Sequence, residues 1–227
     1  MKTKVLERNQ SKIFLEVEGD RYYTRNKSAL ERKNQFYCED LLCQTLAPFK
    51  AEVKQILEIG CATGQKLQYL CQHFEACGSG VDPSSKAVRD GNRRLSAASI
   101  QNVALKVSTA NVLPFERRQF DLVYLAFCLC WVGRDHLFAA IAEADRVLKP
   151  GGFLAVGDFD PAQRHKRPYH HMEGLFSYKQ QYADLFTASG HYHLISKGSL
   201  SHSSHHFSKD SDERMSLCLL YKEPQPY

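Results

Sequence analysis

Several features that would assign a chain to a class of proteins are missing from this sequence. No apolar run approaches the length of a membrane-spanning helix, and the first residues, MKTKVLER, lack the apolar core of a secretory signal. The eight cysteines include no C-x-x-C pair, which argues against a zinc ribbon and favours free, reduced thiols. We therefore expect a cytoplasmic protein without a membrane segment.

Charge of one sign is also scarce. The net charge is +5 over 227 residues, which is too small to indicate a nucleic-acid partner and fits an anionic small substrate equally well. No internal repeat is evident. Hydrophobic residues make up 43% of the chain, which is enough for the core of one domain with an appendage.

The stretch from Gln55 to Gly64, QILEIGCATG, is the part around which the rest is organised. Its apolar run predicts a buried strand that stops at Gly60, and the segment from Gln65 to His73 has leucines at helical spacing. A strand, a glycine-containing turn and a helix can cradle a nucleotide. Glycine lets the ligand approach the backbone, and the helix start presents unpaired N–H groups. An ordinary strand-turn-helix is the alternative for this stretch alone.

An acid further along the chain favours a nucleoside ligand. Asp82 ends a second short strand about twenty residues later, where a carboxylate can bind both hydroxyls of a ribose. The sequence lacks the third glycine that fits a pyrophosphate in the dinucleotide fingerprint. The turn therefore suits a nucleoside without a pyrophosphate.

Expected strands and helices alternate through the middle of the chain. The strands are expected near residues 55–59, 79–81, 104–107, 121–126 and 153–157, and the helices over 86–98 and 136–148. This alternation implies a parallel sheet with helices on both faces. A loop-like segment, 160–171, a helix over 178–189 and two final strands, 192–196 and 215–221, are expected to follow.

The N-terminal residues, 1–34, are polar and rich in charge. Tyr22 and Tyr23 are flanked by arginines, which combines flat stacking surfaces with side chains that bind anions. A solvated arm without a role is the alternative. Leucine and aromatic spacing predicts a helix over 29–46, which Pro48 ends.

Together these segments resemble the class I S-adenosylmethionine-dependent methyltransferases. The resemblance covers roughly residues 55–159. EIGCATG stands where the family reads E/D-x-G-x-G-x-G, and FDLV and RVLKPGG match later motifs. It implies a Rossmann-like, doubly wound α/β fold with a mostly parallel seven-stranded sheet and an antiparallel C-terminal strand pair. We expect an N-terminal arm and helix that cover the site (1–50), a methyltransferase domain (51–227) and, within it, a substrate-binding insertion (158–190).

The resemblance implies S-adenosylmethionine as the cofactor and a set of residues around it. Glu58 would neighbour the methionine ammonium, and Asp82 would take the ribose hydroxyls. Ala62 replaces a glycine of the family's turn. The cofactor-binding set expected from the resemblance is Glu58, Gly60, Ala62, Thr63, Gly64, Asp82, Pro83, Ser84, Thr109, Ala110, Asn111 and Phe127.

Two positions depart from the family pattern. STANVLPF resembles the family's G-D-A-x-x-L-P-F, so Thr109 stands where an acid commonly meets the adenine amino group. A hydroxyl can accept the same hydrogen bond more weakly. After the fourth strand, LCWV stands where the family often has L-H-W, so we expect no base at Cys130. We predict that Trp131 walls the cavity, with plain core packing as the alternative.

The methyl acceptor is expected beside this pocket. Ligands of parallel sheets bind at the carboxyl ends of the strands, and the loop after residue 158 leaves that edge with a cluster of basic residues and histidines. An exposed loop without a role is the alternative. The expected catalytic residues are His170, His171 and Tyr169. The expected substrate-binding residues are Tyr22, Tyr23, Arg25, Asn26, Trp131, Asp158, Arg164 and Tyr178.

The acceptor is expected to be a small, anionic molecule that receives the methyl group on oxygen or nitrogen. Four short segments resemble a bacterial subgroup associated with surface-polysaccharide and nonulosonic-acid biosynthesis: EGDRYYTRN (18–26), GDFDP (157–161), PYHH (168–171) and FSYK (176–179). This resemblance suggests a sugar or sugar nucleotide. A cofactor-binding protein without catalysis and an RNA methyltransferase are the alternatives. No N/D-P-P-Y/F tetrad supports base methylation, so nucleic acid is not expected as a partner; a homodimer is left open.

Metal binding is a further alternative. Eight of the ten histidines lie from His165 onward, and His191 and His193 would share one face of a strand. No carboxylate or cysteine stands at a fixed spacing from them. We therefore expect no metal site.

Overall fold

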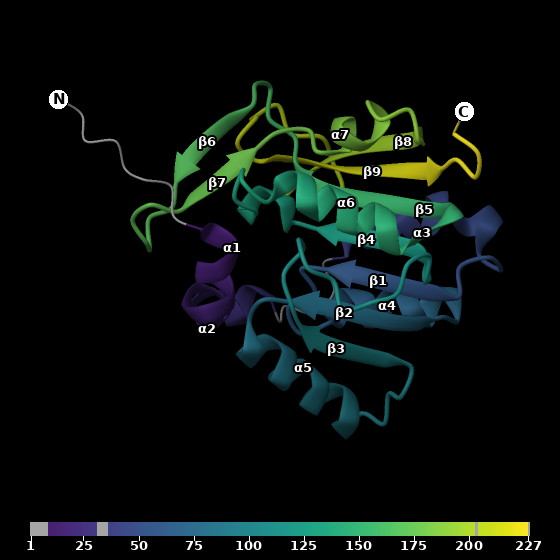
Figure 1. Cartoon of the computed structure of the whole chain (residues 1–227), viewed down its shortest axis with the longest axis horizontal. Helices are drawn as coiled ribbons and strands as arrows, with labels where there is room; N and C mark the ends of the chain where they lie inside the picture. Colours follow the sequence, from purple (N-terminus) through teal and green to yellow (C-terminus); the bar gives the residue numbers. More distant parts are fainter. Residues whose placement is uncertain (1–8, 31–35, 203, 227) are drawn as a thin grey trace.

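A computed structural model describes residues 9–30, 36–202 and 204–226, and these form one three-layer α/β/α unit (Figure 1). The central sheet has seven strands in the order β3-β2-β1-β4-β5-β9-β8. They are β1 (Gln55–Ile59), β2 (Cys77–Asp82), β3 (Val103–Val107), β4 (Phe120–Ala126), β5 (Leu148–Phe159), β8 (Tyr192–Ser201) and β9 (Arg214–Lys222).

The strand directions confirm the predicted fold. β1 to β5 pair in parallel, and β9 pairs antiparallel with both β5 and β8. β1 lies between β2 and β4, so the strand order reverses beside β1. Ligands of open α/β sheets bind at such a reversal, outside the carboxyl ends of the strands.

Helices cover both faces of the sheet because its central strands are apolar on both faces. Ile56 contributes to the core on one face, and its neighbour Leu57 contributes to the core on the other. The first face packs against α3 (Tyr37–Thr45), α4 (Gln65–Phe74) and α5 (Ser85–Ala97), and the second against α6 (Leu137–Val147) and α7 (Ala183–Thr187).

The N-terminal arm, residues 9–30, is helical and lies at the end of the sheet to which the parallel strands point (Figure 1). It comprises α1 (Gln10–Ile13), a π-helical turn (Phe14–Glu18) and α2 (Gly19–Leu30). The buried amide of Gln10 fixes its start: Nε2 donates to the carbonyl oxygens of Trp131 and Phe176, and Oε1 accepts from the Phe176 N–H. The arm is thus joined to segments more than a hundred residues away.

Three local predictions were wrong. The helix predicted over 29–46 begins too early. Residues 29 and 30 end α2, and residues 31–35 lie outside the described part of the chain. In place of a loop and a long helix, β6 (His165–Pro168) and β7 (Phe176–Lys179) form a hairpin, and only 183–187 are helical. Phe176 and Tyr178 are two residues apart, which is the spacing of one face of a strand. This spacing favours a strand at the place where we predicted the start of a helix over 178–189.

No helix in the described ranges has the length and apolarity to cross a membrane.

Candidate active site

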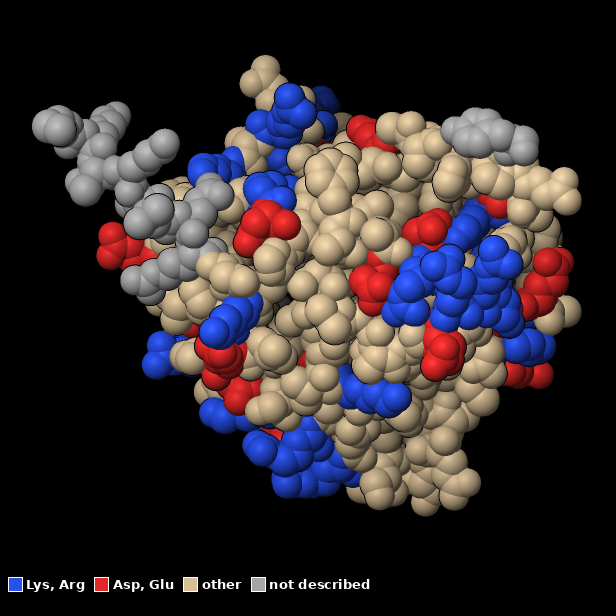
Figure 2. All heavy atoms as spheres, in the orientation of Figure 1, with Lys and Arg blue, Asp and Glu red and all other residues tan. Residues whose placement is uncertain are grey.

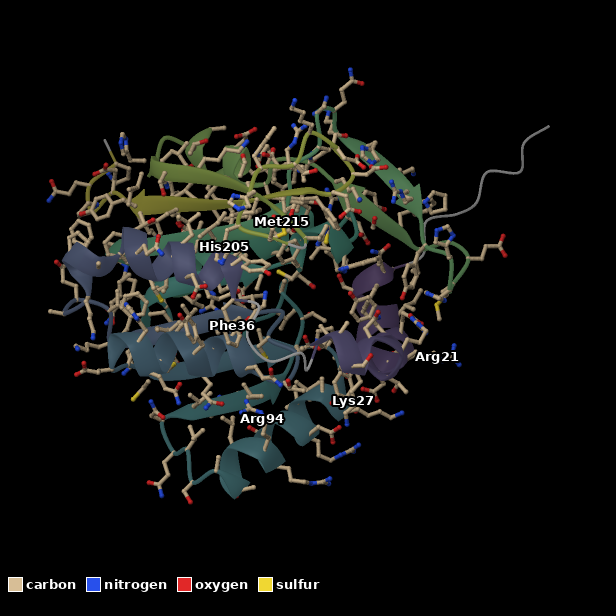
Figure 3. The ribbon with its side chains drawn as sticks, turned by 180° about the vertical axis from the view of Figure 1, so that it is seen from behind. Arg21, Lys27, Phe36, Arg94, His205 and Met215 are labelled. Carbon is tan, nitrogen blue, oxygen red and sulfur yellow. The ribbon has the colours of Figure 1, made fainter. Side chains whose placement is uncertain are left out.

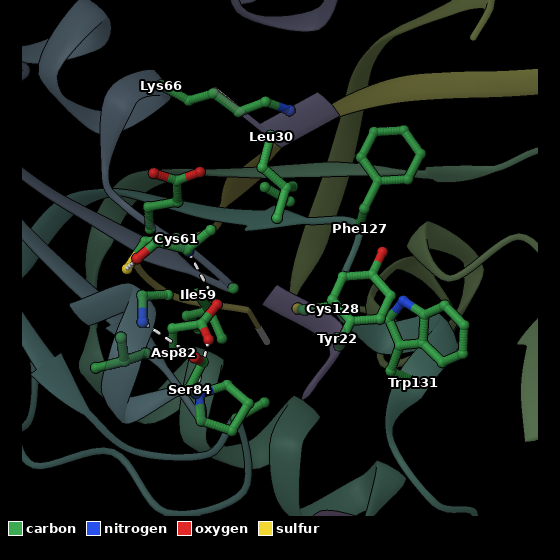
Figure 4. A pocket seen from close by; sticks show the side chains of 18 of the residues that line it. Tyr22, Leu30, Ile59, Cys61, Lys66, Asp82, Ser84, Phe127, Cys128 and Trp131 are labelled. Atoms are coloured by element: carbon green, nitrogen blue, oxygen red, sulfur yellow. Dashed lines mark hydrogen bonds between the residues drawn. The ribbon is translucent and has the colours of Figure 1, made fainter. Parts of the chain in front are cut away.

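A cavity of about 430 Å³ opens at the carboxyl edge of the parallel strands, which is a size typical of small-molecule sites. Its floor is the turn after β1 together with the ends of β2 and β4. The N-terminal arm, the start of α3 and the β8–β9 hairpin complete the walls. In Figure 4, Asp82 lies on one side of this space, and Phe127, Tyr22 and Trp131 lie on the other.

The turn after β1 is held in left-handed backbone conformations. Gly60, Ala62 and Gly64 have φ values of 87°, 46° and 71°. The Gly60 N–H donates to the Val81 carbonyl oxygen at 2.8 Å, which ties the turn to the end of β2. Ala62 stands where the resembling family has glycine, and a left-handed conformation costs such a residue about 1–2 kcal/mol. The turn therefore contains three left-handed residues, of which the non-glycine Ala62 is strained.

Asp82 connects the two sides of the floor. Its Oδ2 accepts the Ala62 N–H at 2.9 Å, and its Oδ1 accepts the Ser84 N–H at 2.8 Å. Burial raises the pKa of this carboxyl to about 6, although the two N–H groups favour its charged form. Each oxygen can accept a second hydrogen bond, so the carboxylate can still bind two hydroxyls from the cavity.

The other end of the floor carries ionisable groups at close range. Glu58 is 1% exposed, and its Oε2 has no hydrogen-bond partner among the described residues. Burial raises the pKa of Glu58 to about 8, against the opposing charge of Lys66. The Lys66 ammonium lies 3.1 Å from Oε1 of buried Glu39, which also accepts the Tyr124 hydroxyl at 2.7 Å. Burial lowers the pKa of Lys66, but Glu39, Cys38 and Glu58 together outweigh it, so the lysine pKa is raised.

The N-terminal arm packs directly against the part of the cavity floor that contains Asp82 and Ser84. Asp20 Oδ1 accepts the Ser84 hydroxyl and the Lys86 N–H, both at 2.8 Å, at the start of α5. Gly19 allows this approach, because a Cβ there would lie 3.1 Å from the Ser84 nitrogen and 2.5 Å from the Phe14 oxygen. Viewed from behind, Lys27 of α2 lies beside α5 (Figure 3), and its ammonium is 3.2 Å from Asp90.

The same arm reaches the β6–β7 hairpin through Glu18. This carboxylate is fully buried, and its Oε1 accepts both the Arg25 guanidinium and the Tyr169 hydroxyl, the latter at 2.9 Å. The Tyr169 ring lies 5.2 Å from that of Trp131, which Tyr22 meets edge-on at 5.6 Å. The arm therefore fixes an aromatic group at the cavity wall.

Most of the predicted cofactor residues line the cavity. Those that do are Glu58, Gly60, Ala62, Thr63, Asp82, Pro83, Ser84, Thr109, Ala110 and Phe127. Gly64 lies behind the turn, where a Cβ would meet Leu105 at 2.8 Å, and Asn111 is also outside the lining. Of the predicted substrate residues, Tyr22, Tyr23 and Trp131 line it.

The remaining substrate candidates lie outside the lining and support the wall. Asn26 donates to the Tyr22 carbonyl oxygen at 2.9 Å, and Arg25 binds Glu18. Asp158 accepts the Cys130 and Phe159 N–H groups, and burial raises its pKa to about 7. The Tyr178 ring is covered by Arg134 at 4.1 Å. Arg164 is exposed just before β6.

The predicted catalytic histidines are not brought to the cavity. His170 and His171 are exposed in the turn between β6 and β7, and neither lines the cavity. Tyr169 precedes them and is held by Glu18 and Arg25, so it supports Trp131 instead of facing the cavity. A catalytic role for these three residues has no geometric support here and stays a prediction.

Several cavity residues were missed from the sequence. Lys66 is the second residue of α4, and Glu39 lies on the buried side of α3 beside Cys38 and Leu42. An acid on an apolar helix face was a readable signal for Glu39. His202 and Met215 belong to the β8–β9 hairpin, and Figure 3 shows Met215 and His205 on the side where α3 lies. No local sequence pattern predicts that these two residues line the cavity, because only the pairing of strands in the sheet brings this hairpin there.

The face drawn in Figure 2 and the described side chains were the places to look for a nucleic-acid or metal ligand. On the face in Figure 2, lysines and arginines form separate groups with acidic residues between them, not a continuous basic field. Within the described residues, no group of three or more His, Cys, Asp or Glu side chains is arranged to hold a metal ion.

The central segment of the chain is similar in sequence to known methyltransferases. A methyltransferase domain family matches residues 56–152. Demethylmenaquinone methyltransferase of Tropheryma whipplei (strain Twist) is 27% identical over 150 residues, 66% of this chain and 59% of that protein. Fatty-acid O-methyltransferase of Mycolicibacterium smegmatis is 32% identical over 130 residues, 55% of this chain and 44% of that protein. The chain thus spans about half the length of these curated relatives.

Solved structures agree on the fold. The 1,6-didemethyltoxoflavin-N1-methyltransferase of Burkholderia thailandensis, with 1,6-didemethyltoxoflavin and S-adenosylhomocysteine bound, superposes with a TM-score of 0.73 at 12% identity, covering 96% of this chain and 92% of that one. A putative sarcosine dimethylglycine methyltransferase from Galdieria sulphuraria gives 0.64 at 14% identity, covering 91% and 99%. Residues 56–152 therefore match a methyltransferase domain, and the chain shares a Rossmann-like fold with these structures.

Proposed function

We propose that this protein transfers a methyl group from S-adenosylmethionine to an oxygen or nitrogen atom of a small molecule. The observation that carries the proposal is the position of Asp82. Its two oxygens hold the Ala62 and Ser84 N–H groups at the wall of the cavity, inside the segment that matches methyltransferases. A carboxylate fixed in this way is prepared to bind the two hydroxyls of a ribose.

The residues present fit this cofactor. The buried Glu58 Oε2 lacks a partner, and a buried acceptor without a donor is costly unless a ligand completes it. An ammonium is a suitable partner, and Lys66 beside it suits a carboxylate. Asp82 would hold the ribose, with Pro83, Thr109 and Ala110 nearest to the adenine. These roles match the zwitterion and the nucleoside of S-adenosylmethionine.

The chain's own contribution is to position the reactants and exclude water. When bound, S-adenosylmethionine supplies a methyl group that its sulfonium charge already activates. The arm covers the cavity with Tyr22, and Trp131 closes the adjacent wall. Holding an acceptor atom in line removes much of the entropic barrier of a bimolecular displacement.

The sequence predicts a sugar or sugar nucleotide of surface-polysaccharide biosynthesis as acceptor, and the lining charges argue against an anionic one. Among the described lining residues, the acids are Glu39, Glu58 and Asp82, whereas Lys66 is the sole lysine or arginine and already pairs with Glu39. An added anion would face a net negative lining. We therefore favour a neutral acceptor. A cytoplasmic location and a homodimer stay predictions from the sequence.

The experiment is a two-stage assay on the full chain. Calorimetric titration with S-adenosylhomocysteine tests the cofactor site, and transfer of label from methyl-labelled S-adenosylmethionine to a panel of phenols, amines, sugar nucleotides and RNA tests the reaction. Binding with transfer to a small molecule is expected. Binding without transfer to any acceptor would favour the non-catalytic alternative, and transfer to RNA would favour the RNA methyltransferase.

Glu58 should make cofactor binding release a proton. Because burial raises its pKa to about 8, the free protein holds this proton at pH 7. An ammonium beside Glu58 favours the ionised form, so binding at pH 7 should release about one proton, and affinity should rise with pH from below toward 8. Calorimetry with S-adenosylhomocysteine in two buffers of different ionisation enthalpy counts the protons.

Glu58→Gln should abolish this release. Glu143→Gln is the matched control, because the Arg146 guanidinium holds the pKa of Glu143 below its usual value and Glu143 lies outside the cavity lining. Proton release that persists in Glu58→Gln would show that another group, and not Glu58, faces the ammonium.

A further inference from the structure

The part of the cavity across from Asp82 is built from aromatic rings. Phe127 and Phe159 meet edge-on with centroids 6.0 Å apart, and both line the cavity. Tyr22 and Trp131 form a second edge-on pair at 5.6 Å. Figure 4 shows Phe127, Tyr22 and Trp131 together on this side. Rings on several walls suit a flat ligand, because offset and edge-on contacts with π-systems are both available.

The chain holds Phe127 in this position at a cost. Its φ is 50°, a left-handed conformation that a bulky residue adopts only when the surroundings impose it. The Phe127 N–H donates to the Gly157 carbonyl oxygen at 2.8 Å, which fixes the turn after β4 on β5. Strained residues of this kind cluster at ligand sites. The strain therefore marks Phe127 as a placed side chain.

His202 stands at the mouth of the same region. Its ring centroid is 5.1 Å from that of Phe159 and 5.9 Å from that of Phe127, and it lines the cavity while keeping an exposed surface. Its backbone N–H donates to the Glu213 carbonyl oxygen at 3.2 Å, which anchors it to the approach of β9. An imidazole at this border can contact a ligand and water.

The groups around His202 favour its neutral form. Burial lowers the pKa of this imidazole below its ordinary value; Glu213 opposes the shift, and Lys179 adds to it. The Lys179 ammonium also covers the Phe159 ring at 3.9 Å from its centroid. A neutral imidazole can accept a proton at pH 7.

We propose that the acceptor is an uncharged aromatic or heteroaromatic ring bearing a hydroxyl or ring N–H, bound against Phe127, Phe159 and Trp131, with His202 taking its proton. This rests on the proposed methyl transfer and names its acceptor class. For a phenol, the O–H bond breaks and the proton moves to the imidazole. An oxygen lone pair forms the bond to the methyl carbon as the carbon–sulfur bond breaks, and that electron pair stays on sulfur, leaving a neutral thioether. The imidazolium then passes its proton to water at the mouth.

The single tryptophan of the chain, Trp131, makes acceptor binding observable without turnover. We would follow its fluorescence with S-adenosylhomocysteine saturating and titrate 4-nitrophenol, cyclohexanol and UDP-glucose. The flat phenol should quench the signal and bind at least about tenfold more tightly than the other two. Phe159→Leu should weaken 4-nitrophenol about tenfold and leave S-adenosylhomocysteine affinity unchanged.

Ionisation of the bound phenol tests His202. The phenolate absorbance of bound 4-nitrophenol at pH 6, where most of the free compound is neutral, should fall at least about fivefold in His202→Gln, while its affinity changes less than about threefold. His205→Gln is the matched control, because His205 belongs to the same hairpin and contacts the Tyr37 ring but does not itself line the cavity.

The outcomes separate the two proposals. If UDP-glucose binds and 4-nitrophenol does not, the aromatic acceptor is wrong while the methyltransferase assignment stands. An unchanged phenolate signal in His202→Gln overturns the role of His202. Failure of the wild-type protein to bind S-adenosylhomocysteine overturns the proposed function itself.

Discussion

Asp82→Ala is expected to lower the affinity for S-adenosylhomocysteine by at least about a hundredfold. A hydrogen bond to a charged group contributes about 1.5–3 kcal/mol, and two ribose hydroxyls would lose such a partner. Water can replace part of this in the open cavity, so a loss of about 3 kcal/mol, equivalent to about two powers of ten, is reasonable. Isothermal titration calorimetry on the purified chain measures it directly.

Asp121→Ala is the matched control for this result. Asp121 also accepts two backbone N–H groups, those of Lys54 at 3.0 Å and Gln55 at 2.8 Å, and its other oxygen meets the Lys149 ammonium at 2.6 Å. It lies at the opposite end of the parallel strands from the cavity. We expect lower stability but unchanged affinity. Equal losses of affinity in both variants would show that Asp82 acts through folding and not through the ribose.

Gly60→Ala should both destabilise the protein and abolish cofactor binding. The residue has φ 87°, and an added Cβ would lie 2.8 Å from Cys128 Cβ and 3.1 Å from the Ala126 oxygen. The left-handed conformation costs about 1–2 kcal/mol, and overpacking adds about 1–3 kcal/mol. Relief of the clash must push apart the turns after β1 and β4, which both form the cavity. Urea unfolding and calorimetry measure the two effects.

Gly151→Ala separates strain from crowding. Its φ is 78°, but an added Cβ would meet only the Tyr221 hydroxyl, at 3.7 Å, and the position lies outside the cavity lining. We expect a loss of about 1 kcal/mol from the conformation alone and unchanged affinity for S-adenosylhomocysteine. Wild-type affinity in Gly60→Ala would contradict the view that the contact between these two turns shapes the site.

Local sequence patterns predicted the fold because three strands of the parallel sheet, β1, β2 and β4, are followed by helices with clear amphipathic patterns. The apolar runs of β1 and β4 and the cap at Ser84, whose hydroxyl accepts the Ala87 N–H at 3.0 Å, are short-range features. Two of the three errors fell on residues 160–190, where the hairpin of β6 and β7 depends on pairing between the two strands. Strand pairing is set by partners and not by the segment alone.

The residues that we propose to bind the cofactor could be predicted from the sequence for the same reason. Asp82 ends β2, and Gly60 and Thr109 lie just after β1 and β3; the carboxyl ends of parallel strands meet at one edge of the sheet whatever the loops do. The residues that we propose to bind the methyl acceptor could not be predicted from the sequence. His170 and His171 offered the chemistry of a base, yet the anchoring of Tyr169 by Glu18 leaves them in solvent.

By itself, the sequence determined the doubly wound sheet and placed Gly60 and Asp82 at its carboxyl edge, where we propose that a sulfonium nucleoside binds, because strand periodicity, turn glycines and a capping acid act within a few residues. Only the tertiary structure decided what stands opposite that pocket. Glu39 comes from α3, His202 from the β8–β9 hairpin and Phe159 from the end of β5. They line the same cavity because β9 lies beside β5 in the sheet, and the N-terminal arm covers the same edge. Side chains that far apart in the chain share a cavity through packing, which leaves no mark in local sequence.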